Sequence, residues 1–283
     1  MDEQMALHTA SRRYCMERAP GLDPRHEEHW YRDRRWTRNR ELFMAWSNAR
    51  GTGAQLIVLG AVLFHIEQVT PNDFLSVDAL RTFLLETGRT IGHEQTDSPD
   101  PDVERETEKE RALFCTYIEN LPADDLRAVA PLPYRRVLGQ REQERIWQRL
   151  KRRWGLTPQL HWYPLQDVQL PPYVVALQED WFARYVPPDV LRQILMQRRV
   201  RRVWELREAG SFPQYEMDVA LLVPWGGGGE HCWTSEKMDW ILYTSHESSV
   251  TIGGDWLFNL VKQAWPQWEE HIYTTYEYQH PPL

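Results

Sequence analysis

Apolar residues recur at helical spacing through most of the first half of the chain. This pattern predicts helices over 7–19 and 40–49. A more continuous apolar stretch over 54–69 predicts a helix that is buried on nearly all sides. We therefore expect this third helix to lie at the centre of the hydrophobic core formed by the first half of the chain.

Three further segments extend the helical pattern towards the middle of the chain. Ser76 is a suitable N-cap, and Gly88 is where the helix that it begins should end. The segment 103–121 has an acidic first turn, which suits the helix dipole, and it follows a polar loop over 93–100. Between Gly139 and Gly155 the apolar side chains form one stripe, made of Ile146, Trp147, Leu150 and Trp154. This spacing predicts an amphipathic helix whose other face is basic.

The pattern changes after Gly155 to short alternating runs, which predict strands. The expected strands are 160–165, 200–208, 215–225, 238–247 and 249–254, and the expected helices are 171–186, 187–199 and 255–273. We expect Val219–Pro224 to pair with Trp240–Ser245 as antiparallel neighbours. The four glycines 226–229 would then lie in the exposed connection.

The predicted fold class is α+β. A helical N-terminal region over 1–155 should precede an α+β domain over 156–283, in which helices flank a mainly antiparallel sheet.

Composition restricts the location and the class of the protein. The 283 residues contain no apolar run of about 18, and the first residues do not form a signal peptide, so we expect a cytoplasmic protein without a membrane partner. Three widely spaced cysteines also suit a reducing compartment. The basic residues are 29 arginines and four lysines, which indicates a GC-rich genome or a need for guanidinium groups.

The glycine run does not match a nucleotide-binding loop. A phosphate-binding loop requires Gly-Lys-Ser/Thr, but Glu230 follows the glycines here. A carboxylate at that position would repel a phosphate, so we interpret the run as a hairpin connection and predict no cofactor.

The spacing of Cys and His residues along the sequence gives little support for a catalytic nucleophile or a metal site. Cys232 could be imagined with His231 or His246, but adjacent residues of a strand point to opposite faces, which separates His231 from it. Neither Cys-x-x-Cys nor His-Glu-x-x-His occurs, so we predict no metal and no stoichiometric zinc.

The sequence SHES, residues 245–248, has two interpretations. The first is structural: the group turns the chain within two to four residues, and Glu247 faces water. The alternative is a hydrolase or transferase in which His246 is a base held by a carboxylate. The candidate catalytic residues for that alternative are His246, Glu247, His161 and Glu179.

Tryptophan usage favours a protein-binding function. The chain has 14 tryptophans, and an exposed group near the glycines would bind a protein partner through Trp225, Trp233, Trp240 and Glu230. Arginine-rich segments over 135–153 and 192–207 offer a second alternative, nucleic-acid binding. The net charge of −8 and the absence of a known motif weigh against it.

Two stretches resemble segments of bacterial hypothetical proteins, namely LPYRRVLGQREQERIWQRLKRRWG with the following HWYPL, and DWILYTSHESSVTIGGDWL. In its order of elements, the last third also resembles the SUKH-type immunity proteins of polymorphic toxin systems. This resemblance implies an immunity-like protein that binds its partner by surface complementarity, without catalysis. No functional residue is carried over by it.

Overall fold

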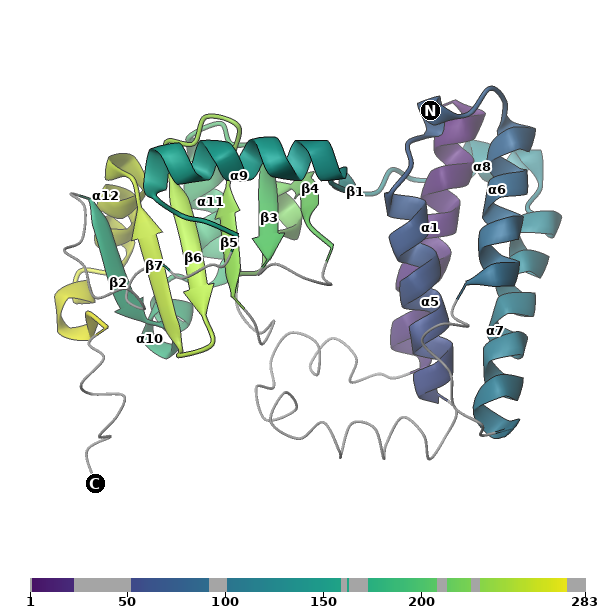
Figure 1. Ribbon diagram of the computed structural model, residues 1–283, viewed down its shortest axis with the longest axis horizontal. Helices are drawn as coiled ribbons and strands as arrows, with labels where there is room; N and C mark the ends of the chain where they lie inside the picture. Colours follow the sequence, from purple (N-terminus) through teal and green to yellow (C-terminus); the bar gives the residue numbers. More distant parts are fainter. Residues whose placement is uncertain are drawn as a thin grey trace. The chain divides into compact units, whose positions relative to one another are not determined.

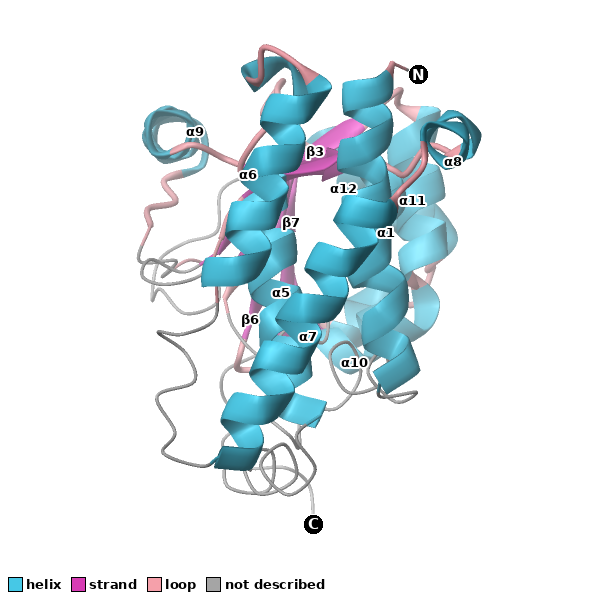
Figure 2. Cartoon of the chain, turned by 90° about the vertical axis from the view of Figure 1, so that its right-hand side faces the viewer, coloured by secondary structure: helices cyan, strands magenta, loops and turns pink. Residues whose placement is uncertain are grey.

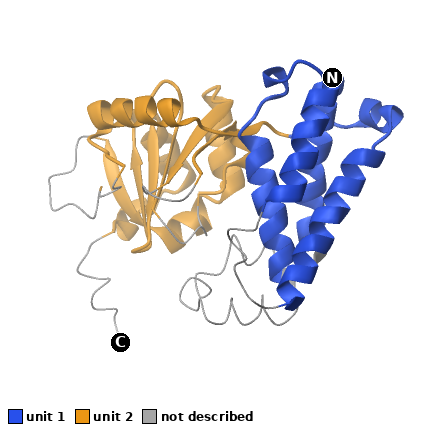
Figure 3. Cartoon of the chain, turned by 45° about the vertical axis from the view of Figure 1, so that its right-hand side comes forward, with its two compact units in different colours: residues 1–132 blue, residues 133–283 orange. Residues whose placement is uncertain are grey.

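The chain folds into two units, residues 1–132 and 133–283 (Figure 3). The computed structural model describes residues 2–22, 52–91, 101–158, 162, 173–207, 213–224 and 230–273. Helices fill the first unit and a sheet with flanking helices forms the second, which confirms the α+β class.

In its described residues, unit 1 has four long helices that lie side by side (Figures 1 and 2). They are α1 (Glu3–Leu22), α5 (Thr52–Glu67), α6 (Val77–Thr90) and α7 (Pro101–Asn120), and the short helix α8 (Ala123–Ala128) follows them. Helix α5 contacts both α1 and α7, and α6 contacts the same two helices, so the four surround one core. That core includes Leu7, Val58, Leu59, Val62, Leu80, Leu84, Phe114 and Ile118.

The expected start of α6 is confirmed, but its expected end is wrong. The Ser76 hydroxyl accepts the N–H of Ala79 at 3.1 Å, as an N-cap does. Gly88 lies inside the helix, which continues to Thr90. A Cβ atom at Gly88 would lie 2.6 Å from Cδ1 of Phe114. The glycine therefore permits α6 and α7 to approach each other closely. The helix expected over 40–49 and the loop over 93–100 lie outside the described residues.

Unit 2 contains one antiparallel sheet, with the strand order β1-β4-β3-β5-β6-β7-β2 (Figure 1). Its strands are β1 (Arg135–Val137), β2 (Val174–Gln178), β3 (Arg202–Arg207), β4 (Tyr215–Asp218), β5 (His231–Thr234), β6 (Ile241–Ser245) and β7 (Ser249–Gly253). Its helices are α9 (Gln140–Trp154), α10 (Glu179–Tyr185), α11 (Pro188–Gln197) and α12 (Asp255–Ala264).

Helices cover both faces of this sheet. Helix α9 packs Ile146, Trp147 and Leu150 on one face, over a cluster that includes Cys232 and Tyr243. Helices α10, α11 and α12 pack on the other face, whose cluster includes Val203, Trp233, Leu242 and Ile252. The predicted apolar stripe of 139–155 is confirmed, and Gly155 ends α9 with a positive φ of 72°.

Strands β1 and β2 were not expected. The segment 174–178 was predicted as part of a helix, but it forms β2 and pairs with β7. A short apolar run fits a buried strand as well as a helix, and its two adjacent valines favour the strand. Strand β1 was also missed, because it is only three residues long. Since β1 pairs with β4 and α9 packs on the sheet, both belong to unit 2, which begins at Pro133, before the expected boundary near Gly155.

The predicted pairing of Val219–Pro224 with Trp240–Ser245 is wrong. Val219–Leu221 forms a 3-10 turn, and β6 pairs instead with β5 and β7. Residues 231–234 form a strand of their own, which also pairs with β3. The glycines 226–229 lie outside the described residues. No helix among the described residues is both long enough and apolar enough to cross a bilayer.

Candidate functional site

A tight turn joins β6 to β7 and carries the SHES residues. Ser245 and Ser249 are paired across the two strands, so the loop has three residues, as the sequence predicted. The N–H of Ser248 donates to the carbonyl of Ser245 at 3.1 Å, which closes the turn. Ser248 itself has a φ of 67°, in the left-handed region that a three-residue hairpin loop requires.

Glu230 reaches this turn from the neighbouring strand. Because His231 pairs with Thr244, the residue before His231 lies beside the residues that follow Thr244. The Glu230 Oε1 atom lies 2.6 Å from Nδ1 of His246, and it also accepts the His246 backbone N–H at 3.4 Å. Its second oxygen accepts a hydrogen bond from the hydroxyl of Tyr243. Three donors thus hold one carboxylate in place.

The burial of the two side chains differs sharply. The Glu230 side chain is 3 % exposed, whereas the His246 side chain is 61 % exposed. A buried carboxylate loses its hydration and requires hydrogen-bond donors in return. The hydrogen bond at Nδ1 orients an imidazole ring that is itself largely exposed.

Glu247 contacts the second nitrogen of the ring. Its Oε1 atom lies 2.8 Å from Nε2 of His246, so each ring nitrogen faces a carboxylate. Both nitrogens can donate only in the imidazolium form, whereas the neutral ring leaves one nitrogen as an acceptor. The Oε2 atom of Glu247 is buried and has no hydrogen-bond partner among the described residues. The expectation that Glu247 simply faces water is therefore wrong.

Glu179 also lies near the turn. Its backbone N–H donates to the carbonyl of Ser248 at 2.9 Å, and its side chain is buried at the start of α10. The fold thus places His246 and Glu247, both named from the sequence, in contact, and it places the backbone of Glu179 beside the same turn. The fourth candidate, His161, lies outside the described residues.

Three of the four residues that were expected to form a protein-binding surface are buried. Trp233, Trp240 and Glu230 are each at most 3 % exposed, so they cannot contact a partner at the surface. Large aromatic side chains here fill the cores on both faces of the sheet. Trp225 lies outside the described residues. The protein-binding function itself stays a prediction.

Cys232 is not placed to act as a nucleophile. It is fully buried beneath α9, and burial raises the pKa of its thiol well above the usual range. His231 lies on the opposite face of the sheet, as the alternation of strand residues predicted, and its ring contacts Trp233.

His231 belongs to a second polar group, on the face covered by α10–α12. Burial, and then the charge of Arg207, lower the pKa of His231 to about 4. Burial would raise the pKa of Glu205, but the nearby charges of Arg207 and Arg135 keep it below its usual value. Arg207 donates to Glu205 at 2.6 and 2.9 Å, so this group is an internal ion pair beside a neutral histidine.

One group of residues has ligand atoms suitable for a metal ion. Atoms of Glu230, His246 and Glu247 lie within 4.8 Å of one another. Spacing along the sequence did not reveal this group, because Glu230 comes from a different strand. A single ion could not bind both nitrogens of one ring, however, and these nitrogens face different carboxylates. An ion would therefore have to replace one of the existing hydrogen bonds.

Sequence reasoning identified His246 and Glu247 but assigned Glu230 to a surface and did not select Tyr243. The register of β5 against β6 is the signal that connects all four.

Comparison of the chain with protein-family models, with curated proteins and with solved structures found no match.

Proposed function

We propose that unit 2 is an enzyme of the hydrolase or transferase class, with His246 as its general acid–base. One observation carries this proposal: a carboxylate that is 3 % exposed lies 2.6 Å from Nδ1 of an imidazole that is 61 % exposed. A buried carboxylate that fixes the tautomer and direction of an accessible histidine is the arrangement used in acid–base catalysis.

The cost of burying Glu230 supports a functional role. The turn is already closed by the hydrogen bond from Ser248 to Ser245 and by the pairing of β6 with β7. A buried charge pair adds little net stability, because desolvation offsets most of the attraction. We therefore assign the buried carboxylate to orienting His246 rather than to stabilising the fold.

In this proposal the neutral ring has its proton at Nδ1, which donates to Glu230. The ring then accepts a second proton at Nε2. The proton comes from an attacking water or acceptor hydroxyl, and the imidazolium then returns it to the leaving group. Glu230 stabilises the charge that the ring acquires. Glu247 must move away from Nε2 to admit the substrate, which its place on the exposed turn permits.

The test is turnover of activated esters, phosphate esters and glycosides by the full chain. We expect His246→Ala to reduce the rate for the accepted class by at least about 100-fold, the lower end for general acid–base catalysis. The matched control is His65→Ala, which removes a partly exposed histidine from α5 in unit 1. Equal rates for the parent and His246→Ala on every accepted substrate would exclude this function.

A further inference from the structure

Helix α9 presents a row of cations to solvent. Arg141, Arg145 and Arg152 lie on one side of the helix, with Gln148 between them, and all four residues are exposed. Their spacings of four, three and four residues place them on one line along the helix. We name Arg141, Arg145 and Arg152 the α9 basic stripe.

The three arginines differ from most of the described arginines of unit 1, because they form no ion pair with a carboxylate of the described residues. No ion pair joins them to any of the described residues of the chain. In unit 1, by contrast, carboxylates pair with Arg12, Arg13, Arg18, Arg89, Arg105, Arg111 and Arg127. In a chain with a net charge of −8, three cations on one line of a helix without an ion pair to a described residue are a distinct local feature.

Helix stability does not explain the whole stripe. Basic residues in the last turn suit the helix dipole, and this accounts for Arg152. Arg141 lies in the first turn, where a positive charge opposes the same dipole. Arg149 and Arg153 have structural contacts, since they donate to the carbonyls of Glu236 and Met238. Arg141 and Arg145 have no comparable contact in the described part of the chain.

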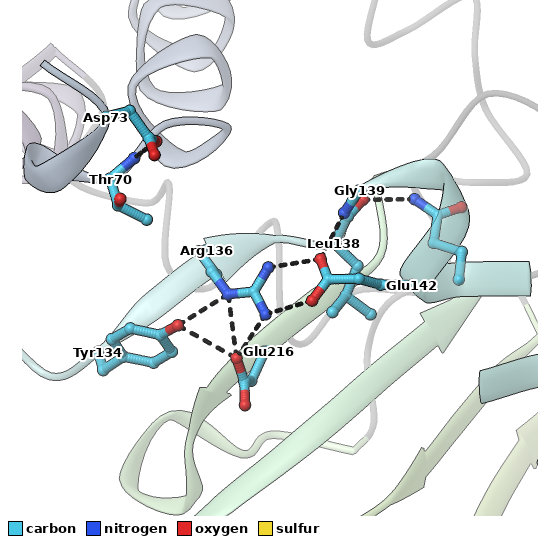
Figure 4. A network of polar contacts seen from close by, with 9 residues as sticks. Thr70, Asp73, Tyr134, Arg136, Leu138, Gly139, Glu142 and Glu216 are labelled. Atoms are coloured by element: carbon cyan, nitrogen blue, oxygen red, sulfur yellow. Dashed lines mark hydrogen bonds and ion pairs between the residues drawn. The ribbon is translucent and has the colours of Figure 1, made fainter. Parts of the chain in front are cut away.

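The helix that carries the stripe is held firmly on unit 2. Its other face buries Ile146, Trp147 and Leu150 against the sheet. Its first turn is held by Arg136, which donates to Glu142 at 2.7 and 2.8 Å and to Glu216 at 3.0 Å (Figure 4). The cations are therefore presented along a rigid line.

The geometry and chemistry of this line favour a nucleic acid over an acidic protein. The distance along the helix from Arg141 to Arg152 is 11 steps of about 1.5 Å, or about 16 Å. One strand of a DNA duplex carries about five phosphates over that length. Arginine binds phosphate oxygens through two parallel hydrogen bonds. Protein interfaces instead have apolar, aromatic-rich centres, and no apolar side chain lies on this stripe.

We propose that the α9 basic stripe binds the phosphate backbone of a nucleic acid without reading its sequence. Phosphate contacts position a protein on a nucleic acid but carry no base specificity. This binding is independent of the acid–base function proposed for His246, because it involves other residues and a different element.

The experiment measures binding of the full chain to a labelled strand of about 20 nucleotides, alone and annealed to its complement, at several salt concentrations. The variant Arg141→Gln/Arg145→Gln/Arg152→Gln removes three positive charges and retains good helix formers. The control Arg89→Gln/Arg105→Gln/Arg127→Gln removes the same charge from unit 1, where these side chains are at least 60 % exposed. Circular dichroism of both variants tests whether they are folded like the parent.

We expect the parent and the control to bind, with an affinity that falls as salt rises. The α9 variant should bind at least about tenfold more weakly, and its slope of log affinity against log salt should be shallower by about 2 to 3, as expected for three lost phosphate contacts. The proposal is overturned if the parent binds neither probe at about 50 mM salt, where such contacts are strong. It is also overturned if the two variants have equal slopes, or if labelled poly-L-glutamate binds through these arginines while the nucleic acids do not.

Discussion

His231 should make the stability of unit 2 depend on pH in a way that can be calculated. Its pKa is lowered from 6.5 to about 4 in the folded chain, first by burial and then by Arg207. In the unfolded chain the imidazole is protonated below about pH 6.5. As the pH falls from 6.5 towards 4, the unfolded state binds a proton that the folded state does not, so stability decreases with falling pH. Below about pH 4 both states are protonated and this effect levels off.

The magnitude follows from the distance between the pH and the unfolded pKa. At about pH 5 the separation is about 1.5 units, and each unit corresponds to about 1.4 kcal/mol, so His231 should destabilise the folded state by about 2 kcal/mol relative to pH 7.5. The change to make is His231→Phe, which retains a ring beside Trp233 and cannot titrate. The variant should lose about 2 kcal/mol less stability than the parent over this range.

The assay is urea unfolding followed by tryptophan fluorescence at about pH 7.5 and about pH 5. Eleven of the 14 tryptophans lie in 133–283, so the signal reports mainly on unit 2. The pKa of the buried His8 is also lowered, first by burial, but His8 is present in both proteins and its effect cancels. Equal pH dependence of the parent and His231→Phe would refute the reasoning.

Three further predictions concern packing, the turn and metal binding. Gly88→Ala should destabilise the chain by about 1–2 kcal/mol because its Cβ would lie 2.6 Å from Phe114, whereas Gly60→Ala, which meets nothing within 4 Å, should stabilise it by about 1 kcal/mol. Urea unfolding followed by circular dichroism measures both, and a stabilising Gly88→Ala would contradict the packing argument. Ser248→Gly should stabilise unit 2 by about 0.5–1 kcal/mol, since glycine adopts the positive φ without strain, and a loss measured by fluorescence-detected unfolding would show that another contact of Ser248 dominates. Purified protein should contain no stoichiometric zinc, because the nitrogens of His246 face different carboxylates, and about one zinc per chain in elemental analysis would contradict this.

Local features of the fold were predictable where one physical signal dominates. The apolar stripe of α9, the Ser76 cap and the proline at the start of α11 are each defined by a few neighbouring residues. Gly88 was misplaced because its role depends on Phe114, which belongs to another helix. Residues 174–178 were assigned to a helix because the pairing with β7 that makes them a strand is not visible in a local pattern.

The candidate site was predictable only in part, for the same reason. His246 and Glu247 are adjacent in a short turn, and the alternation of the flanking strands located that turn. Glu230 lies 16 residues before His246, and it reaches the imidazole only through the register of β5 against β6. Nothing near Glu230 in the sequence indicates that a carboxylate there would be buried, so it was assigned to a surface.

The most direct test of the site is a double-mutant cycle on turnover, using Glu230→Gln, His246→Ala and the combination of both. If Glu230 acts by holding His246, its loss should slow the parent strongly but should have no further effect once the imidazole is gone. The account therefore predicts that the double variant has the same kcat as His246→Ala alone. Losses that multiply in the double variant would show that Glu230 acts independently of His246 and would contradict the account.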